Sequence, residues 1–199
     1  MLCMAGHGSR TVHVHSVAEA YLYLQITPCG RCGRGPVRTQ GELTRRGERA
    51  GAYEVIVRCE ACQASDVKAF VISPPPTRES GERNIINDTS ERSSAVDLLG
   101  WLTLFRSILE ASEKAADKAT ARALAWEAAQ CLDEALKFYD ADNEMPPADA
   151  FFSEASRQRF REHPQHFARS KWMERRLKLP NATVRTTSAP RRKWWQFWK

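Results

Sequence analysis

The sequence predicts an α+β protein in which a small β-rich region precedes a separate all-α helical bundle and a disordered tail. Three observations support this prediction. Two C-x-x-C steps stand among short segments that alternate apolar and polar residues. A run of prolines then interrupts the chain, and beyond it apolar residues recur at helical spacing. We therefore divide the chain into a domain at 1–73, a Pro/Gly-rich linker at 74–88, a four-helix domain at 89–180 and a tail at 181–199.

Length and composition are those of a globular protein. The 199 residues suffice for one large domain or two small ones, and 42% hydrophobic and 27% charged content is ordinary. The first residues lack the apolar stretch of a signal peptide, and no run approaches the 18 apolar residues of a membrane span. We expect a cytoplasmic, reducing location, where paired cysteines at this spacing favour a metal over a disulfide.

Charge is distributed unevenly along the chain. Residues 1–80 carry 10 basic and 7 acidic residues, 81–145 carry 7 and 13, and 146–199 carry 13 and 4. The overall net charge of +6 therefore comes from the C-terminal quarter, which alone carries +9. This split indicates that the C-terminal end meets an anionic surface, either phosphate or lipid headgroups. Association of the tail with the acidic middle of the chain is the alternative.

Three short strands and one helix are predicted in the first domain. The capping-box spacing of Ser16 and Glu19 indicates a helix over 18–24, although 21–26 also fits a strand. Alternation predicts strands, and the Gly/Arg-rich stretch at 41–51 reads as a loop. The strands are expected at 11–15, 53–58 and 66–72.

Four helices are predicted in the second domain. The first is expected from Glu91 to about Lys114, with Asp88, Thr89 or Ser90 as its cap, and a short connection makes it antiparallel to the second. The others are expected at 117–140, 149–161 and 164–179. Bulky residues on the last two helices are expected to close the core, namely Phe151, Phe152, Phe160, Phe167, Trp172, Met173 and Leu177, together with Ala155.

The two cysteine pairs are the strongest chemical signal. Cys29 and Cys32 form the first pair, and Cys59 and Cys62 the second. Four thiolates in two C-x-x-C steps can close a tetrahedral cage around Zn²⁺. Gly33 suits the positive φ that such a turn needs, whereas the second pair is followed by Gln63, which makes the second turn less typical.

This arrangement resembles the zinc-ribbon fold over about residues 25–72. The resemblance implies that Cys29, Cys32, Cys59 and Cys62 are structural zinc ligands. Four protein ligands leave no open coordination position, so such a zinc would stabilise the fold and would not activate water. Rubredoxin-like iron is the alternative, but the second pair lacks that family's usual proline and glycine.

Arginines surround the cysteine pairs. Arginine suits phosphate because its planar fork donates two parallel hydrogen bonds. We therefore single out a partner- or phosphate-binding set, although the chain uses arginine generally, with 22 Arg and 8 Lys. No aromatic residues interleave this set, which weakens a single-strand nucleic-acid interpretation. The set is Arg31, Arg34, Arg45, Arg46 and Arg49, with Arg38 and Arg58 nearby.

The remaining reactive residue types give no catalytic pattern. The histidine pairs 13/15 and 163/166 lack further ligands in sequence, and the acidic residues between 133 and 144 lack calcium-loop spacing. Cys131 lies on a predicted apolar helix face and is expected to be buried. Phosphate-binding loops, nucleophile elbows and H-E-x-x-H motifs are missing from the sequence, so we expect no enzyme.

The tail combines cations with aromatic residues. Tryptophan beside cations suits the headgroup region of an anionic membrane. The same side chains could fill pockets on a protein partner, or fold back onto the helical domain. The residues concerned are Arg191, Arg192, Lys193, Trp194, Trp195, Phe197 and Trp198.

Together these features predict a zinc-stabilised, non-catalytic interaction protein. Its basic ribbon and Trp-rich tail would bind a protein partner or an anionic surface, and two tethered weak contacts gain affinity through effective concentration. The alternative is a nucleic-acid-binding zinc-ribbon protein, with affinity that falls steeply with salt. The helical region resembles no family specifically.

Overall fold

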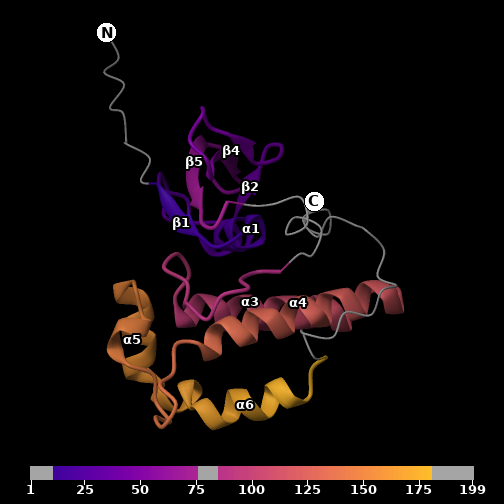
Figure 1. The fold of residues 1–199 in the computed structure, drawn as a ribbon, viewed down its shortest axis with the longest axis vertical. Coiled ribbons are helices and arrows are strands. Elements are labelled where there is room, and N and C mark those ends of the chain that lie inside the picture. Colours follow the sequence, from indigo (N-terminus) through magenta and orange to yellow (C-terminus); the bar gives the residue numbers. More distant parts are fainter. Residues whose placement is uncertain (1–10, 76–84, 181–199) are drawn as a thin grey trace. The chain divides into compact units, whose positions relative to one another are not determined.

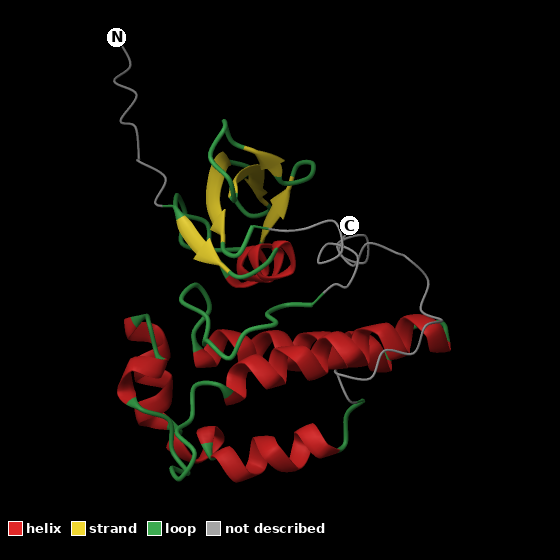
Figure 2. Ribbon diagram, in the orientation of Figure 1, coloured by secondary structure: helices red, strands yellow, loops and turns green. Residues whose placement is uncertain are grey.

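A computed structural model describes residues 11–75 and 85–180 of the chain (Figure 1). They form a mixed α+β structure with one small sheet and five α-helices among the described residues (Figure 2). The chain divides into two compact units, Met1–Ile86 and Asn87–Lys199. The predicted tail and the middle of the predicted linker lie outside the described residues.

The first unit contains the sheet. Its strands lie in the order β1-β5-β4-β2, and β3 pairs with the same β4 strand as β2 does. β1 runs parallel to β5, whereas all the other pairs are antiparallel. The strands are β1 (Val12–Val14), β2 (Val37–Thr39), β3 (Thr44–Arg45), β4 (Ala52–Cys59) and β5 (Ser65–Ile72). β3 lies inside the stretch that the sequence predicted as a loop.

One face of the sheet contributes to the core of this unit. Val55 and Val57 alternate along β4 and are both 2% exposed. Helix α1 (Val17–Ile26) packs against the sheet, where Tyr23 meets Phe70 edge to face at 6.0 Å. The Oγ of Ser16 accepts the first-turn N–H of Glu19, as the capping box predicts. The helical interpretation of this segment is confirmed, and the strand alternative is wrong.

The second unit is helical in its described part. Its α-helices are α3 (Leu98–Glu113), α4 (Lys118–Leu136), α5 (Glu154–Glu162) and α6 (Arg169–Leu177), with short 3₁₀ turns η1 (Ala148–Ala150) and η2 (Pro164–Phe167). Helices α3 and α4 lie side by side (Figure 1). Trp101, Ile108 and Leu132 are fully buried, and Ala128 and Ala135 are small enough for the helices to approach closely.

The first predicted helix begins later than expected. Its N-cap is Asp97, whose carboxylate accepts the N–H of Gly100 at 2.8 Å, so residues 91–97 are not helical. The Oγ of Ser93 instead accepts the backbone N–H groups of Ala95 and Val96. Such side-chain bonds compete with helix formation, which explains why the earlier candidate caps are not used.

Two other helix predictions were only partly right. The predicted helix at 149–161 is a 3₁₀ turn followed by α5, which is capped by Ser153, and the one at 164–179 is likewise divided at Ala168. Four residues expected in the core are exposed. Phe152 is 42% exposed, Met173 40% and Leu177 83%, and Ala155 is also exposed. Helices α5 and α6 each bury a single residue, Ser156 and Trp172, and the core is completed by Phe151, next to η1, and Phe167 of η2.

Candidate metal centre

The first cysteine pair lies in a tight turn between α1 and β2. The N–H of Cys29 donates to the carbonyl of Arg34 at 2.6 Å, and the N–H of Gly33 donates back to the carbonyl of Cys29 at 2.8 Å. Gly33 has φ +66°, the left-handed conformation that glycine adopts at low cost. The turn therefore projects both sulfurs from one short loop.

The second pair lies between β4 and β5 and repeats this pattern. The N–H of Cys59 donates to the carbonyl of Ala64, and the N–H of Gln63 donates to the carbonyl of Cys59, both at 2.9 Å. Gln63 has φ 60° although it is not glycine. Its side-chain amide donates to the carbonyl of Glu60 at 2.9 Å. The second turn is thus typical in geometry, contrary to the sequence-based expectation.

Strand pairing brings the two turns together. Val37 of β2 lies opposite Cys59 of β4, and the N–H of Glu60 donates to the carbonyl of Pro36 at 3.1 Å. The first turn precedes β2 directly and the second follows β4 directly. Antiparallel pairing of these two strands therefore places both turns at the same end of the sheet.

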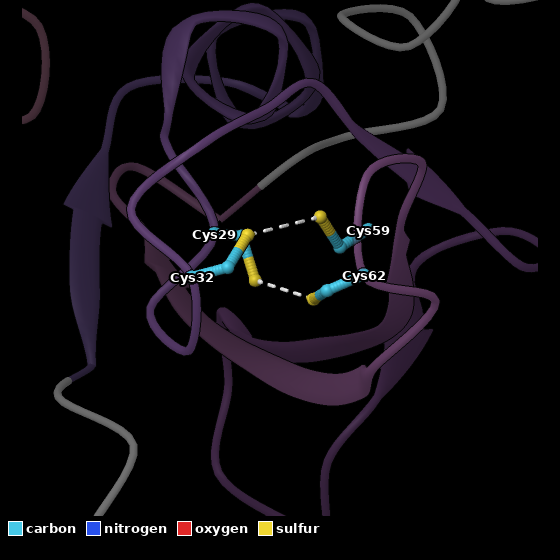
Figure 3. Close-up of side chains that lie close together, drawn as sticks. All are labelled: Cys29, Cys32, Cys59 and Cys62. Carbon is cyan, nitrogen blue, oxygen red and sulfur yellow. Dashed lines mark hydrogen bonds between the residues drawn. The ribbon is translucent and has the colours of Figure 1, made fainter.

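The four sulfurs converge on one point. All lie within 4.8 Å of one another, and the Cys29–Cys62 and Cys32–Cys59 sulfur pairs are each 3.7 Å apart (Figure 3). A tetrahedral ion with metal–sulfur bonds of about 2.3 Å has sulfurs about 3.8 Å apart. A disulfide needs about 2.05 Å, and all four cysteines are free. The donor set therefore fits a tetrahedral metal ion.

Backbone groups favour thiolates here. The N–H groups of Cys32 and Arg31 lower the pKa of Cys29 to about 6, and Arg34 similarly lowers the pKa of Cys32. The N–H of Ala64 lowers the pKa of Cys62, but burial and the three neighbouring sulfurs outweigh it and raise that pKa to about 11. Four adjacent thiols cannot all ionise without a cation, which would favour all four thiolates together.

The predicted arginines occupy opposite ends of β4. Arg31 and Arg34 lie on the first cysteine turn, whereas Arg45, Arg46 and Arg49 lie on β3 and the loop that leads to Ala52. These ends are separated by the length of β4, about 23 Å at 3.3 Å per residue. All five are exposed, and Arg46 Nε lies 3.6 Å from Glu54. The set therefore forms two groups rather than one patch.

An exposed apolar pair was missed by the sequence analysis. Ile56 of β4 lies directly opposite Val67 of β5, and they are 49% and 43% exposed. Arg58 shares their face two residues further along β4, opposite Arg38 of β2. Alternation along β4 indicated that Ile56 faces away from Val55 and Val57, but the register that places it beside Val67 was not predictable.

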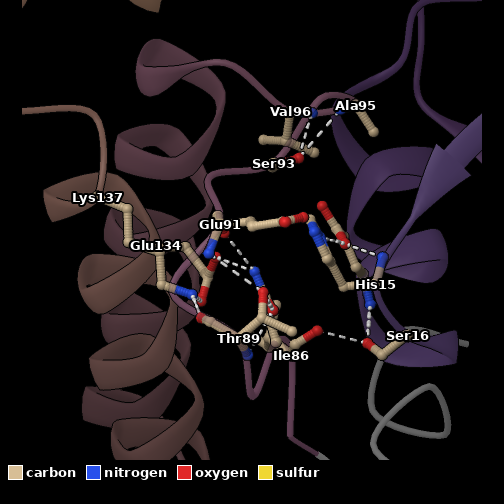
Figure 4. Close-up of polar contacts among 12 residues, drawn as sticks. His15, Ser16, Ile86, Thr89, Glu91, Ser93, Ala95, Val96, Glu134 and Lys137 are labelled. Carbon is tan, nitrogen blue, oxygen red and sulfur yellow. Dashed lines mark hydrogen bonds and ion pairs between the residues drawn. The ribbon is translucent and has the colours of Figure 1, made fainter. Parts of the chain in front are cut away.

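The histidine and acidic candidates make structural contacts (Figure 4). In the first unit, Glu19 accepts hydrogen bonds from the backbone N–H of His15 at 2.5 Å and contacts its Nδ1 at 3.0 Å. In the second unit, Glu134 pairs with Lys137 Nζ at 2.7 Å, and Asp133 pairs with Arg176. Among the described residues, the cysteine quartet alone brings together three or more metal-ligating side chains.

Comparisons with known proteins give no relative. Neither a family model, nor a curated protein, nor a solved structure matches the chain. In the parts of the chain that the structure describes, every helix is too short or too polar to cross a membrane.

Cys131 is fully buried as expected, and burial raises the pKa of its thiol well above the usual value.

Proposed function

We propose that the four cysteines hold a structural Zn²⁺ and that the chain is a zinc-stabilised interaction protein with a zinc-ribbon domain. The observation that carries this proposal is the sulfur cluster, whose spacing suits a four-thiolate ion. Two matching turns, each followed by a strand that pairs antiparallel with β4, support the ribbon assignment. A helical domain and a basic, Trp-rich tail would follow it in the chain.

The proposed role is non-catalytic. Four cysteine ligands complete a tetrahedral shell, so the ion would have no position for water or substrate. Its contribution would be folding free energy, because the two turns and β2 are short and bury little apolar surface themselves. Those elements in turn position the exposed sheet face.

The exposed face of the sheet supports a protein partner. Ile56 and Val67 form an apolar centre, and Arg58 and Arg38 lie beside it on the same face. Apolar side chains next to arginine are typical of protein interfaces, where arginine is enriched and lysine depleted. The partner surface would therefore carry an apolar pocket with carboxylates at its rim. The tail would add a second contact, on a partner or on an anionic membrane.

A binding experiment with matched variants tests this role. Full-length protein, an Ile56→Asp variant and a form lacking 191–199 are used as bait, and captured proteins are identified by mass spectrometry after crosslinking to the sheet face. We expect Ile56→Asp to lose a partner that crosslinks there. Leu177→Asp, the same change at an exposed site on α6, should retain it. Equal capture by the Ile56 variant and its control would contradict the proposal.

Nucleic-acid binding is the second candidate. Arg31, Arg34, Arg45, Arg49 and Arg58 make no ion pair within the described residues. Unpaired arginines can neutralise phosphates, and affinity then falls steeply with salt. Gel-shift measurements at two salt concentrations test this, and the absence of a shift at low salt would exclude it. The two separated arginine groups favour the protein-binding role over a single phosphate groove.

A further inference from the structure

Cations gather around a buried tryptophan in the helical unit. Trp172 of α6 is fully buried, and its indole N–H donates to the carbonyl of His166 at 3.1 Å. Its ring meets Phe105 of α3 edge to face at 6.0 Å. These contacts fix the ring in one orientation.

Three charged groups surround this ring. The terminal cationic atoms of Arg106, Lys171 and Arg175 lie 5.3, 5.7 and 5.5 Å from the ring centroid. Two atoms that each lie within 5.7 Å of one centroid are at most about 11 Å apart. This is close to the Debye length of about 10 Å at 0.1 M salt, so the three charges repel one another.

The neighbouring charges also act on the pKa values of two groups in this region. The pKa of Arg106 is lowered, first by partial burial and then by the nearby charges of Arg175 and Arg159. The pKa of His166 is likewise lowered, first by burial and then by Lys171, His163, Arg159 and Arg106. Arg159 on α5 therefore lies close enough to Arg106 and His166 to act on both.

No carboxylate forms an ion pair with this cluster in the described part of the chain, although the charge of Arg175 contributes to lowering the pKa of Glu174, after the larger effect of Lys178. Arg106, Arg159, Lys171 and Arg175 form no ion pair there. Several cations close by in sequence are paired, namely Arg176 with Asp133, Lys178 with Glu174, and Arg161 with Glu154, whereas Arg169 donates to the carbonyl of Ala141. The unpaired cations are therefore a selected group rather than a general property of α5 and α6.

Contact with the indole offsets only part of this cost. A cation is attracted to the face of an aromatic ring, but the ring carries no net charge and cannot act as a counterion for the three cations around it. An anion with several charges would relieve the repulsion and gain charge-assisted hydrogen bonds. Because Arg106 of α3 and Lys171 and Arg175 of α6 converge on one ring, they suit a compact anion better than an extended backbone.

We propose that Arg106, Arg159, Lys171 and Arg175 form a binding site for a compact ligand that carries two or more phosphate groups. Arginine forks would take phosphate oxygens in pairs, and Lys171 would supply a point charge. His163 and His166, whose rings stack at 5.1 Å, lie beside the site and can donate further hydrogen bonds. This site is separate from the ribbon and the tail of the proposed function.

Calorimetric titration of the full-length chain tests the site. The soluble probe is inorganic tripolyphosphate, and phosphatidylcholine vesicles with and without phosphatidylinositol bisphosphate form the second arm. The variants Arg175→Gln and Arg106→Gln each remove one charge-assisted contact with the anion. We expect each to bind roughly 10- to 100-fold more weakly, which corresponds to about 1.5–3 kcal/mol. Arg122→Gln removes the same charge from an exposed, unpaired position on α4 and should bind as the parent does.

Each outcome bears on the proposal. Tripolyphosphate binding that both cluster variants weaken, and the control does not, supports a soluble phosphate source. Binding to the vesicles that contain phosphatidylinositol bisphosphate, weakened by both cluster variants but not by the control, supports a lipid headgroup source if tripolyphosphate does not bind. Because Arg175 is exposed, its variant should keep the parent's melting temperature and so reports on binding alone. Absence of binding in both arms, or binding by the cluster variants equal to that of the parent, would overturn it.

Discussion

Gln63 adopts in the second cysteine turn the left-handed conformation that Gly33 adopts in the first, with φ values of 60° and 66°. Both follow the second cysteine of their pair, and both donate to the carbonyl of the first cysteine. The left-handed conformation costs an L-residue about 1 kcal/mol or more, whereas glycine adopts it freely. The two turns therefore have the same shape but unequal backbone strain.

Replacing Gln63 with glycine should stabilise the first unit. We expect a gain of about 0.5–1 kcal/mol, because relief of the backbone strain exceeds the entropy that glycine adds to the unfolded chain. The exposed Gln63–Glu60 hydrogen bond is a small loss. Urea unfolding of the parent and Gln63→Gly measures the difference. The matched control, Gly33→Ala, meets no atom within 4 Å and should lose about 1 kcal/mol. A destabilised Gln63→Gly would contradict this account.

Gly51 should be the least replaceable glycine of the sheet. Its φ is +78°, and a Cβ added there would lie 2.5 Å from the carbonyl oxygen of Ile72. That contact is backbone, so relief requires separating β4 from β5. We expect Gly51→Ala to lose about 3 kcal/mol, whereas Gly47→Ala, with φ +62° and open space, should lose about 1 kcal/mol. Thermal unfolding compares them, and equal losses would show that the close approach does not matter.

Burial of Glu127 should make stability depend on pH. This side chain on α4 is 9% exposed, and burial raises its pKa from 4.5 to about 7. Because the folded-state pKa is raised, the contribution of Glu127 to folding stability is most favourable below pH 4.5, where the carboxyl is protonated. This contribution is lost as the pH rises through 7. Above pH 8 the burial of the charged carboxylate destabilises the fold by about 3 kcal/mol, at 1.36 kcal/mol per pKa unit.

Glu127→Gln tests this dependence. The amide has nearly the same shape, so the variant should be more stable than the parent at pH 8 and similar at pH 4.5. Unfolding in urea at both values measures the change. Glu113→Gln makes the same substitution at an exposed position on α3 and should alter stability little at either pH. A Glu127 variant that is less stable at pH 8 would show that the carboxylate is usefully paired.

Metal removal should affect the two units differently. If zinc stabilises the ribbon and the helical unit has its own core, a chelator should abolish β-sheet signals and leave helical circular dichroism largely intact. Amide hydrogen exchange with and without chelator locates the change. Loss of protection in α3 and α4 together with β4 and β5 would contradict independent units.

Local patterns predicted the parts of the fold that depend on neighbouring residues. The two C-x-x-C steps, the Ser16 cap and the alternation along β4 each act over a few residues, and each was recovered from the sequence. The start of α3 was not, because several potential capping side chains precede Asp97 and Ser93 takes the N–H groups of Ala95 and Val96.

Surfaces made by distant segments were beyond the sequence. Arg106 and Trp172 belong to helices far apart in the chain, so their contact depends on how α6 packs. The same is true of Ile56 and Val67, which meet through strand register. The cysteine quartet was predictable because its spacing carries the pairing information.

Metal content is the most direct test of the central claim. Elemental analysis of full-length protein purified without added metal should give one zinc per chain. Cobalt substitution should give the visible absorption of a four-thiolate site, and Cys32→Ser should lose both metal and fold of the first unit, whereas Cys131→Ser should keep the metal. Less than about half an equivalent of zinc in the parent, or the red colour of an iron–thiolate centre, would contradict the account.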